Sequence, residues 1–202
     1  MEKLSLREQI QQMREESILS AMNRLLAEKG FELMTLDELA AQVGVSKASL
    51  YKRYGSKEAL AAAAMVRVLD QALAQAQVLA ALASPRERLR GMARWAMSVQ
   101  LAGDMPSLPS QNSSLRQALL ADGPYMDRLV RLSDLLGEWI GEAQARGELG
   151  SDLPPELVLY TLFARACDPV LGLLKAGGQH SDEQIIALLL RTCFDGLGPS
   201  RG

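Results

Sequence analysis

Basic side chains are grouped in one short stretch of the sequence, at Lys47, Lys52, Arg53 and Lys57. No acidic residue lies between positions 39 and 57. Clustered ammonium and guanidinium groups bind polyanions, because each contact with a phosphate releases condensed counterions. The whole chain has a formal net charge of −2, so a basic surface here is a local feature. The stretch therefore indicates a surface that binds phosphate groups.

Capping signals place this basic stretch on two short helices. Thr35 and Glu38 form a capping box, which predicts a helix that begins at Leu36. Gly44 supplies a residue suited to a turn with positive φ, and Ser46 predicts the cap of a helix that runs to about position 54. Apolar residues at helical spacing are expected to face the core, namely Leu39, Ala40, Val43, Val45 and Leu50.

These offsets are typical of a DNA-binding helix-turn-helix, whose second helix enters the major groove. A solvated basic helix in an ordinary bundle is the alternative, but it needs neither the glycine turn nor the caps. Small side chains at Ala48 and Ser49 would let the backbone approach base edges. Neutral phosphate contacts are expected from Thr35, Ser46 and Tyr54, and contacts to bases or phosphates from Lys47, Tyr51 and Lys52.

Residues 35–60, TLDELAAQVGVSKASLYKRYGSKEAL, strongly resemble the DNA-binding signature of the TetR family of bacterial regulators. The resemblance covers the N-terminal quarter of the chain. It implies a three-helix DNA-binding domain, a helical effector domain, dimerisation through the last two helices and, in most members, repression. By position, it implies that Thr35, Tyr54 and Lys57 contact phosphates. The expected DNA-binding residues are Thr35, Val45, Ser46, Lys47, Ala48, Ser49, Tyr51, Lys52, Tyr54 and Lys57.

The rest of the 202 residues predicts an all-α protein, rich in Ala and Leu at helical spacing and poor in aromatic residues. We expect a DNA-binding domain over residues 1–55 and a ligand-binding and dimerisation domain over residues 56–202. Further helices are predicted over about 7–29, 56–83, 85–101, 124–146 and 157–175, with a short one ending near 121. Residues 103–114 predict a mobile loop. Pro169 departs from the family pattern and predicts a break in the penultimate helix.

The last predicted helix begins after Ser181 and is apolar around more than one face. Such a helix is expected to be buried in its own subunit and against a partner, which predicts a homodimer. Two-fold symmetry in turn predicts a roughly palindromic operator in double-stranded DNA. The apolar positions concerned are Ile185, Ile186, Leu188, Leu189, Leu190, Cys193, Phe194 and Leu197.

Bulky side chains on three central helices are the candidates for an effector pocket. Simple core packing is the alternative for each of them. Arg165 and Asp168 lie three positions apart in an apolar stretch, where they could bind a polar group of a ligand or form a salt bridge at the dimer interface. The pattern favours the salt bridge. The candidate effector-binding residues are Met92, Trp95, Met126, Trp139, Phe163 and Arg165.

Other classes of function find little support in the sequence. The single histidine, His180, lies in a polar turn, and the two cysteines have no metal-ligand spacing, so we expect no metal, no cofactor and no enzymatic activity. The charged N-terminus is no signal peptide and no apolar run spans a bilayer, which predicts a cytoplasmic protein without a membrane partner. Two hypotheses remain: a regulator released by a small-molecule effector, and one controlled by a protein partner or by abundance.

Overall fold

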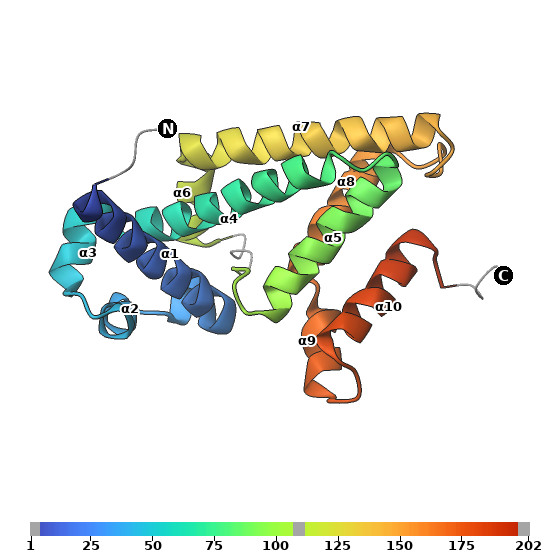
Figure 1. Cartoon of the computed structure of the whole chain (residues 1–202). Coiled ribbons are helices and arrows are strands. Elements are labelled where there is room, and N and C mark those ends of the chain that lie inside the picture. Colours follow the sequence, from blue (N-terminus) through green and yellow to red (C-terminus); the bar gives the residue numbers. More distant parts are fainter. Residues whose placement is uncertain (1–4, 107–111, 198–202) are drawn as a thin grey trace. The chain divides into compact units, whose positions relative to one another are not determined.

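The computed structural model describes residues 5–106 and 112–197, and within them the secondary structure is helical (Figure 1). No strand occurs in these residues, in agreement with the all-α prediction. In chain order the helices are α1 (Leu6–Leu33), α2 (Leu36–Val43), α3 (Lys47–Tyr54), α4 (Lys57–Leu79), α5 (Pro85–Leu101), α6 (Ser114–Ala121), α7 (Gly123–Ala145), α8 (Pro155–Ala164), a 3-10 turn η1 (Arg165–Cys167), α9 (Pro169–Ala176) and α10 (Asp182–Phe194).

Polar N-caps begin the helices where the sequence predicts them. The side chains of Thr35, Ser46, Ser84 and Ser181 each accept a hydrogen bond from the backbone N–H three residues further on. Such a cap satisfies one of the N–H groups that a helix leaves unpaired at its start. These helix starts therefore follow from interactions between residues close together in the sequence.

Helix α1 runs past the predicted end at position 29. Gly30 has φ 72° and ψ 168°, so the helical conformation is interrupted there, and a last turn continues to Leu33. Only glycine adopts this conformation at little cost, because a Cβ atom would clash with the backbone. Ile18, Ala21, Met22 and Leu25 follow one another at helical spacing on α1, and all four are buried.

The chain forms two compact units, each with its own core. Unit 1 comprises Met1–Val68 and Pro106–Met126, and unit 2 comprises Leu69–Met105 and Asp127–Gly202. The boundary between the units falls within α4 and within α7, so each of these helices contributes residues to both units. The division describes packing. The division of function between residues 1–55 and 56–202 remains a prediction.

Unit 1 packs α6 into the same core as α1 to α4. Leu115 and Leu119 of α6 belong to the buried cluster that also contains Leu39 and Leu50. The Ser113 hydroxyl donates to the Glu32 carboxylate over 2.7 Å. A segment distant in sequence therefore supports the helix-turn-helix. Residues 107–111 of the predicted mobile loop lie outside the described residues.

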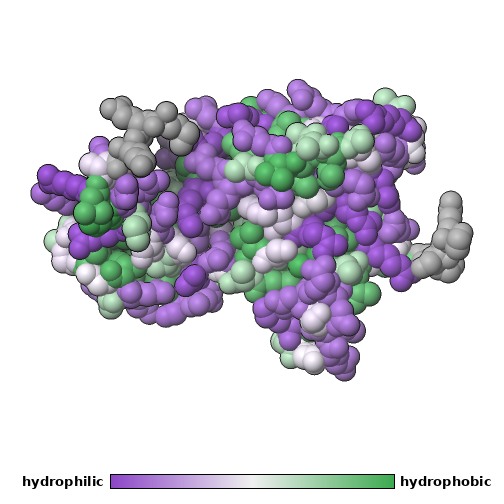
Figure 2. Space-filling model, viewed as in Figure 1, coloured by the Kyte–Doolittle hydropathy of each residue, from purple (hydrophilic) through white to green (hydrophobic). Residues whose placement is uncertain are grey.

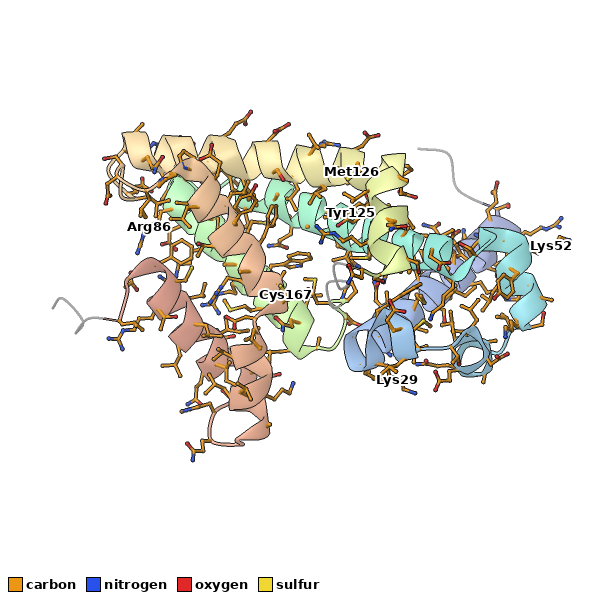
Figure 3. The ribbon with its side chains drawn as sticks, turned by 180° about the vertical axis from the view of Figure 1, so that it is seen from behind. Lys29, Lys52, Arg86, Tyr125, Met126 and Cys167 are labelled. Atoms are coloured by element: carbon orange, nitrogen blue, oxygen red, sulfur yellow. The ribbon has the colours of Figure 1, made fainter. Side chains whose placement is uncertain are left out.

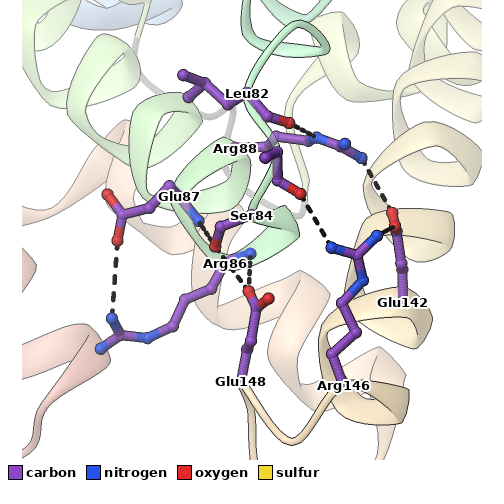
Figure 4. A network of polar contacts seen from close by, with 9 residues as sticks. Leu82, Ser84, Arg86, Glu87, Arg88, Glu142, Arg146 and Glu148 are labelled. Carbon is purple, nitrogen blue, oxygen red and sulfur yellow. Dashed lines mark hydrogen bonds and ion pairs between the residues drawn. The ribbon is translucent and has the colours of Figure 1, made fainter.

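Unit 2 is built around α5, with η1, α8, α9 and α10 packed against it. The break at Pro169 predicted from the sequence is present: α8 gives way to η1, and α9 begins at the proline. A polar network joins the start of α5 to the end of α7 and the turn that follows (Figure 4). Within it the Glu148 carboxylate accepts from the Ser84 hydroxyl over 2.6 Å and from the Arg86 backbone N–H over 3.1 Å.

The last helix is shorter than the apolar pattern predicts. Helix α10 ends at Phe194, and Leu197 lies beyond it with its side chain largely exposed. Asp195 accepts a hydrogen bond from Arg86 over 2.6 Å, which fixes the chain where the helix ends. Leu197 is therefore no part of the helix, although it continues the apolar pattern.

Candidate nucleic-acid interface

Helices α2 and α3 form a helix-turn-helix, which is held in place by apolar contacts on its inner face. Gly44 adopts the left-handed conformation at φ 68°, as predicted, and ends α2. Leu50 is buried on the inner face of α3 with only 2% of its surface exposed, whereas Val43 and Val45 pack partly buried against the same cluster. The inner side of α3 is thereby fixed, and its outer side is left to solvent.

The outer side of α3 carries the small and polar side chains that the sequence assigns to DNA. Lys47, Ala48, Ser49, Tyr51 and Lys52 are all exposed. The Lys52 side chain extends from α3 into solvent (Figure 3) and has no hydrogen bond or ion pair with the described residues. A helix with an anchored inner face and small exposed residues near its start is able to enter a major groove.

Several cations of this region already pair with acidic side chains. Lys47 Nζ lies 2.7 Å from the Asp37 carboxylate, and Lys29 Nζ lies 2.6 Å from that of Glu38. Arg53 pairs with Glu15 of α1. The acid-free stretch of the sequence is therefore not acid-free in space, because residues outside the stretch supply the carboxylates. Asp37 and Glu15 are the residues of this interface that sequence reasoning missed.

Hydrogen bonds shift the pKa values of these charged groups. The bond from Lys47 to Asp37 raises the pKa of the Lys47 ammonium. The bond from Lys29, with a further one from the Thr35 backbone N–H, lowers the pKa of Glu38. Each cation can exchange its carboxylate for a DNA phosphate, since both partners are exposed.

The hydroxyl groups expected to contact phosphates take part in local capping. The Thr35 side chain accepts from the Glu38 N–H and donates to the Glu38 carboxylate over 3.2 Å. The Ser46 and Ser49 hydroxyls share a hydrogen bond of 2.7 Å. A cap satisfies one N–H group of a helix start, so the remaining N–H groups of that turn can bind a phosphate.

Tyr54 and Lys57, which are expected to contact phosphates, both have environments formed within the chain. The Tyr54 hydroxyl is buried without a hydrogen-bond partner among the described residues, and burial raises the pKa of this phenol. Lys57 Nζ donates to the Phe31 carbonyl over 2.6 Å and lies 4.3 Å from the centre of the Phe31 ring. Lys57 thus contacts the residue that follows Gly30. Its ammonium group has further N–H groups that can bind a phosphate. Both phosphate contacts stay predictions.

A buried asparagine joins two helices of unit 1. Asn23 on α1 is fully buried, and its amide donates to the Ala64 carbonyl of α4 over 3.2 Å. The signal in the sequence was a polar residue between Leu19 and Leu26 at helical spacing, within an otherwise apolar stripe.

The residues expected to form an effector pocket are divided between the two units. Met92, Trp95, Trp139 and Phe163 all belong to the hydrophobic cluster of unit 2 or pack against it. Met126, in the first turn of α7 (Figure 3), belongs to unit 1. Arg165 forms an ion pair with Asp168 within the chain. Their role as an effector site remains a prediction.

Unit 2 exposes large apolar side chains on α8, α9 and α10. Figure 2 shows apolar surface over α7 and beside α10. Residues Pro155–Ala176 are long and apolar enough to cross a membrane, and only 17% of their most apolar part is buried, but η1 and Pro169 interrupt the helix. The exposed apolar residues on these helices are Leu157, Tyr160, Val170, Leu173 and Leu188.

The sequence of the helix-turn-helix region is similar to known regulators. Residues 18–64 match the family model described as bacterial regulatory proteins, tetR family. The chain is 40% identical over 58 residues to the uncharacterized HTH-type transcriptional regulator Rv1556 of Mycobacterium tuberculosis, covering 29% of each chain. It is 48% identical over 44 residues to YdeS of Bacillus subtilis, covering 22% of each chain. The similarity thus spans less than a third of these relatives.

Solved structures extend the similarity in fold to nearly the whole chain. FadR from Bacillus subtilis in complex with stearoyl-CoA has a TM-score of 0.68 at 17% identity, covering 91% of this chain and 99% of that one. AibR in complex with isovaleryl coenzyme A and operator DNA has a TM-score of 0.64 at 22% identity, covering 90% and 98%. These identities establish a shared fold only.

Proposed function

Because its N-terminal domain makes this chain a member of the tetR family of bacterial regulatory proteins, we propose that it regulates transcription by binding specific DNA sequences as a repressor. The observation that carries the proposal is α3, fixed through Leu50 on one side and exposing Lys47, Tyr51 and Lys52 on the other. Such a helix provides cations for phosphates and small residues at the base edges.

We propose further that the protein acts as a homodimer. The exposed apolar residues of α8, α9 and α10 need a cover, and a second copy provides one through a symmetric interface. Two copies of α3 would then bind two half-sites of a roughly palindromic operator, about 34–36 Å apart or a multiple of this spacing. The proposed location is the cytoplasm, where DNA is accessible.

A small-molecule effector is the proposed signal for release from DNA. FadR from Bacillus subtilis and AibR, which share the fold, are described in complex with acyl-CoA ligands, and AibR also with operator DNA. Aromatic and Met side chains of the cluster in unit 2 offer an apolar environment for a ligand. Acyl-CoA thioesters are therefore the first compounds to test. An effector releases the protein only if it binds the DNA-free conformation more tightly.

The proposal is tested by selecting genomic fragments that the purified protein retains at moderate salt, with and without acyl-CoA compounds or a metabolite extract. We expect a symmetric sequence to be enriched, and its retention to fall when the effector is present. Retention that no compound or extract changes would favour the regulator without a small-molecule effector. Failure to enrich any symmetric sequence would refute sequence-specific binding.

A further inference from the structure

The break between α8 and α9 contains a largely buried charged pair, Arg165 and Asp168. Cys167 marks the position of the break in Figure 3. Arg165 Nη1 lies 2.6 Å from the Asp168 Oδ2 atom, with 22% and 5% of the two side chains exposed. Transfer of two charges from water into a protein is costly, and a buried pair often stabilises a fold no better than apolar residues would. The pair therefore calls for a reason other than stability.

Asp168 is held through its backbone and one carboxylate oxygen, whereas its buried Oδ2 atom has no hydrogen-bond partner among the described residues. Its carboxylate accepts from the Val170 N–H over 3.0 Å, which caps α9. Its backbone exchanges two hydrogen bonds with the Gln100 side chain of α5, over 3.0 and 3.2 Å. The acidic partner is thus fixed between α5 and α9, whatever Arg165 does.

Arg165 is also only partly satisfied. Its Nε atom is buried and has no hydrogen-bond partner among the described residues, and its Nη1 atom forms the ion pair with Asp168. Guanidinium presents Nε and Nη2 as a two-pronged edge that matches the two oxygens of a carboxylate. A buried hydrogen-bond donor without an acceptor is unfavourable. An oxyanion that accepts hydrogen bonds from this edge would therefore be bound favourably. With 22% of its side chain exposed, Arg165 is partly accessible from solvent.

The surroundings of Arg165 favour an anion with an apolar body. Helices α5 and α8 both pack against η1 and carry the partly buried aromatic residues Trp95 and Phe163. At η1 an incoming anion would meet the Asp168 carboxylate and the Arg165 guanidinium, whose Nε atom has no partner among the described residues. An organic carboxylate suits this combination of one cation and apolar neighbours.

We propose that the Nε–Nη2 edge of Arg165 binds the carboxylate of a small organic acid, and that Asp168 is the counter-ion of the empty site. The proposal rests on the proposed function, in that the free acid, and not its CoA thioester, would serve as effector. A ligand bound to Arg165 would weaken the ion pair between Arg165 of η1 and Asp168. The turn η1 lies between α8 and α9 in the chain, and both of these helices carry exposed apolar residues. Ligand binding would therefore be communicated to the surface through which we propose that two copies associate.

The test uses pairs of probes that differ only in charge: hexanoate with hexanamide, benzoate with benzamide, and phenylacetate with phenylacetamide. Binding to the full chain is measured by isothermal titration calorimetry. We expect at least one carboxylate to bind about tenfold to a hundredfold more tightly than its amide, the range for hydrogen bonds to a charged group. Absence of a preference in all three pairs would overturn the proposal.

Variants assign the preference to Arg165. Arg165→Met alone would leave Asp168 buried without a partner and disturb folding, so the double variant R165M/D168N removes both charges while Asn keeps the cap of α9. We expect this variant to bind acid and amide equally. Asp168→Asn alone should strengthen the preference, because it removes the competing carboxylate. The matched control is Arg94→Gln, which removes an exposed arginine of α5 that pairs with Glu183.

A preference for the carboxylate that persists in the double variant would contradict the assignment to Arg165. The outcome is independent of DNA binding. If the carboxylate binds at Arg165 but the protein retains no symmetric DNA sequence, the proposed function fails and the site stands. If DNA is retained and released by an effector that binds the double variant equally well, the proposed function stands and the site fails.

Discussion

Two regions of the molecule differ in the residues that they expose: the helix-turn-helix of α2 and α3, and the C-terminal helices α8 to α10. The first region buries Leu39 and Leu50 and exposes charged and small polar residues. The second exposes large apolar residues such as Tyr160 and Leu173, and keeps the charged pair of Arg165 and Asp168 inside. This difference is the basis of our proposal that a polyanion covers the first surface and an apolar partner the second. Each prediction below tests one side of this comparison.

The largest effect is expected from the residue that anchors α3. Leu50→Ala removes buried apolar contacts and leaves a cavity, so the free energy of unfolding should fall by about 2 to 5 kcal/mol. DNA binding should be lost with it. Urea unfolding followed by circular dichroism measures the change. The control is Leu33→Ala, an exposed leucine of the same unit, which should stay within about 0.5 kcal/mol of the parent.

The exposed apolar face should respond through association rather than folding. Tyr160→Asp places a charge where we expect a dry interface, which should raise the dissociation constant of the dimer at least about a hundredfold. Analytical ultracentrifugation measures the dissociation constant. Val78→Asp changes an equally exposed apolar residue of α4 and should leave association unchanged. A parent protein that is monomeric at micromolar concentration would contradict the assignment of this face.

Lys52 should contribute to DNA binding without regard to sequence. It has no acidic partner among the described residues, so a phosphate contact releases a counterion at no internal cost. Lys52→Ala should weaken all DNA sequences alike and reduce the slope of log K against log salt by about one. Fluorescence anisotropy at several salt concentrations measures the slope. An unchanged slope, or the same loss in the exposed control Arg131→Ala, would remove Lys52 from the interface.

Asp37 should oppose DNA binding, because it competes with phosphate for Lys47. An exposed ion pair is worth about 0–1 kcal/mol, so Asp37→Asn should tighten binding by up to about fivefold. The same anisotropy assay at low salt measures this gain. Asp134→Asn removes an exposed acid of α7 and serves as the control. Weaker binding by D37N would show that Asp37 positions Lys47 instead.

The smallest effect concerns acid stability of the helix-turn-helix. The pKa of Glu38 is lowered by its bonds with Lys29 and Thr35, so its contribution to stability is present above pH 4.5 and is lost as the pH falls through the lowered value. Glu38→Gln should therefore be less stable than the parent at pH 7 and equally stable in acid. Unfolding curves between pH 3 and 7 measure this difference. A difference independent of pH would exclude the charge as its source.

Local interactions made much of the fold predictable. The caps at Thr35, Ser46, Ser84 and Ser181, the turn at Gly44 and the break at Pro169 depend on residues within a few positions of one another. The ion pairs between distant residues of the interface were not predictable, because the pair of Arg53 with Glu15, for example, joins residues 38 positions apart. The same holds for α6, whose place in the core of unit 1 depends on contacts with α1 to α4. Sequence therefore predicts which helices form the interface better than it predicts which residues pair with the charged side chains there.

The central claim is that the exposed side of α3 reads DNA, and selection from a random DNA pool tests it most directly. The parent protein and Tyr51→Ala are each used to retain fragments, which are then sequenced. We predict that the parent enriches a two-fold symmetric site, and that Y51A retains the symmetry but relaxes the preference at the positions that Tyr51 contacts. Absence of an enriched site, or an identical preference in both proteins, would contradict this assignment of α3.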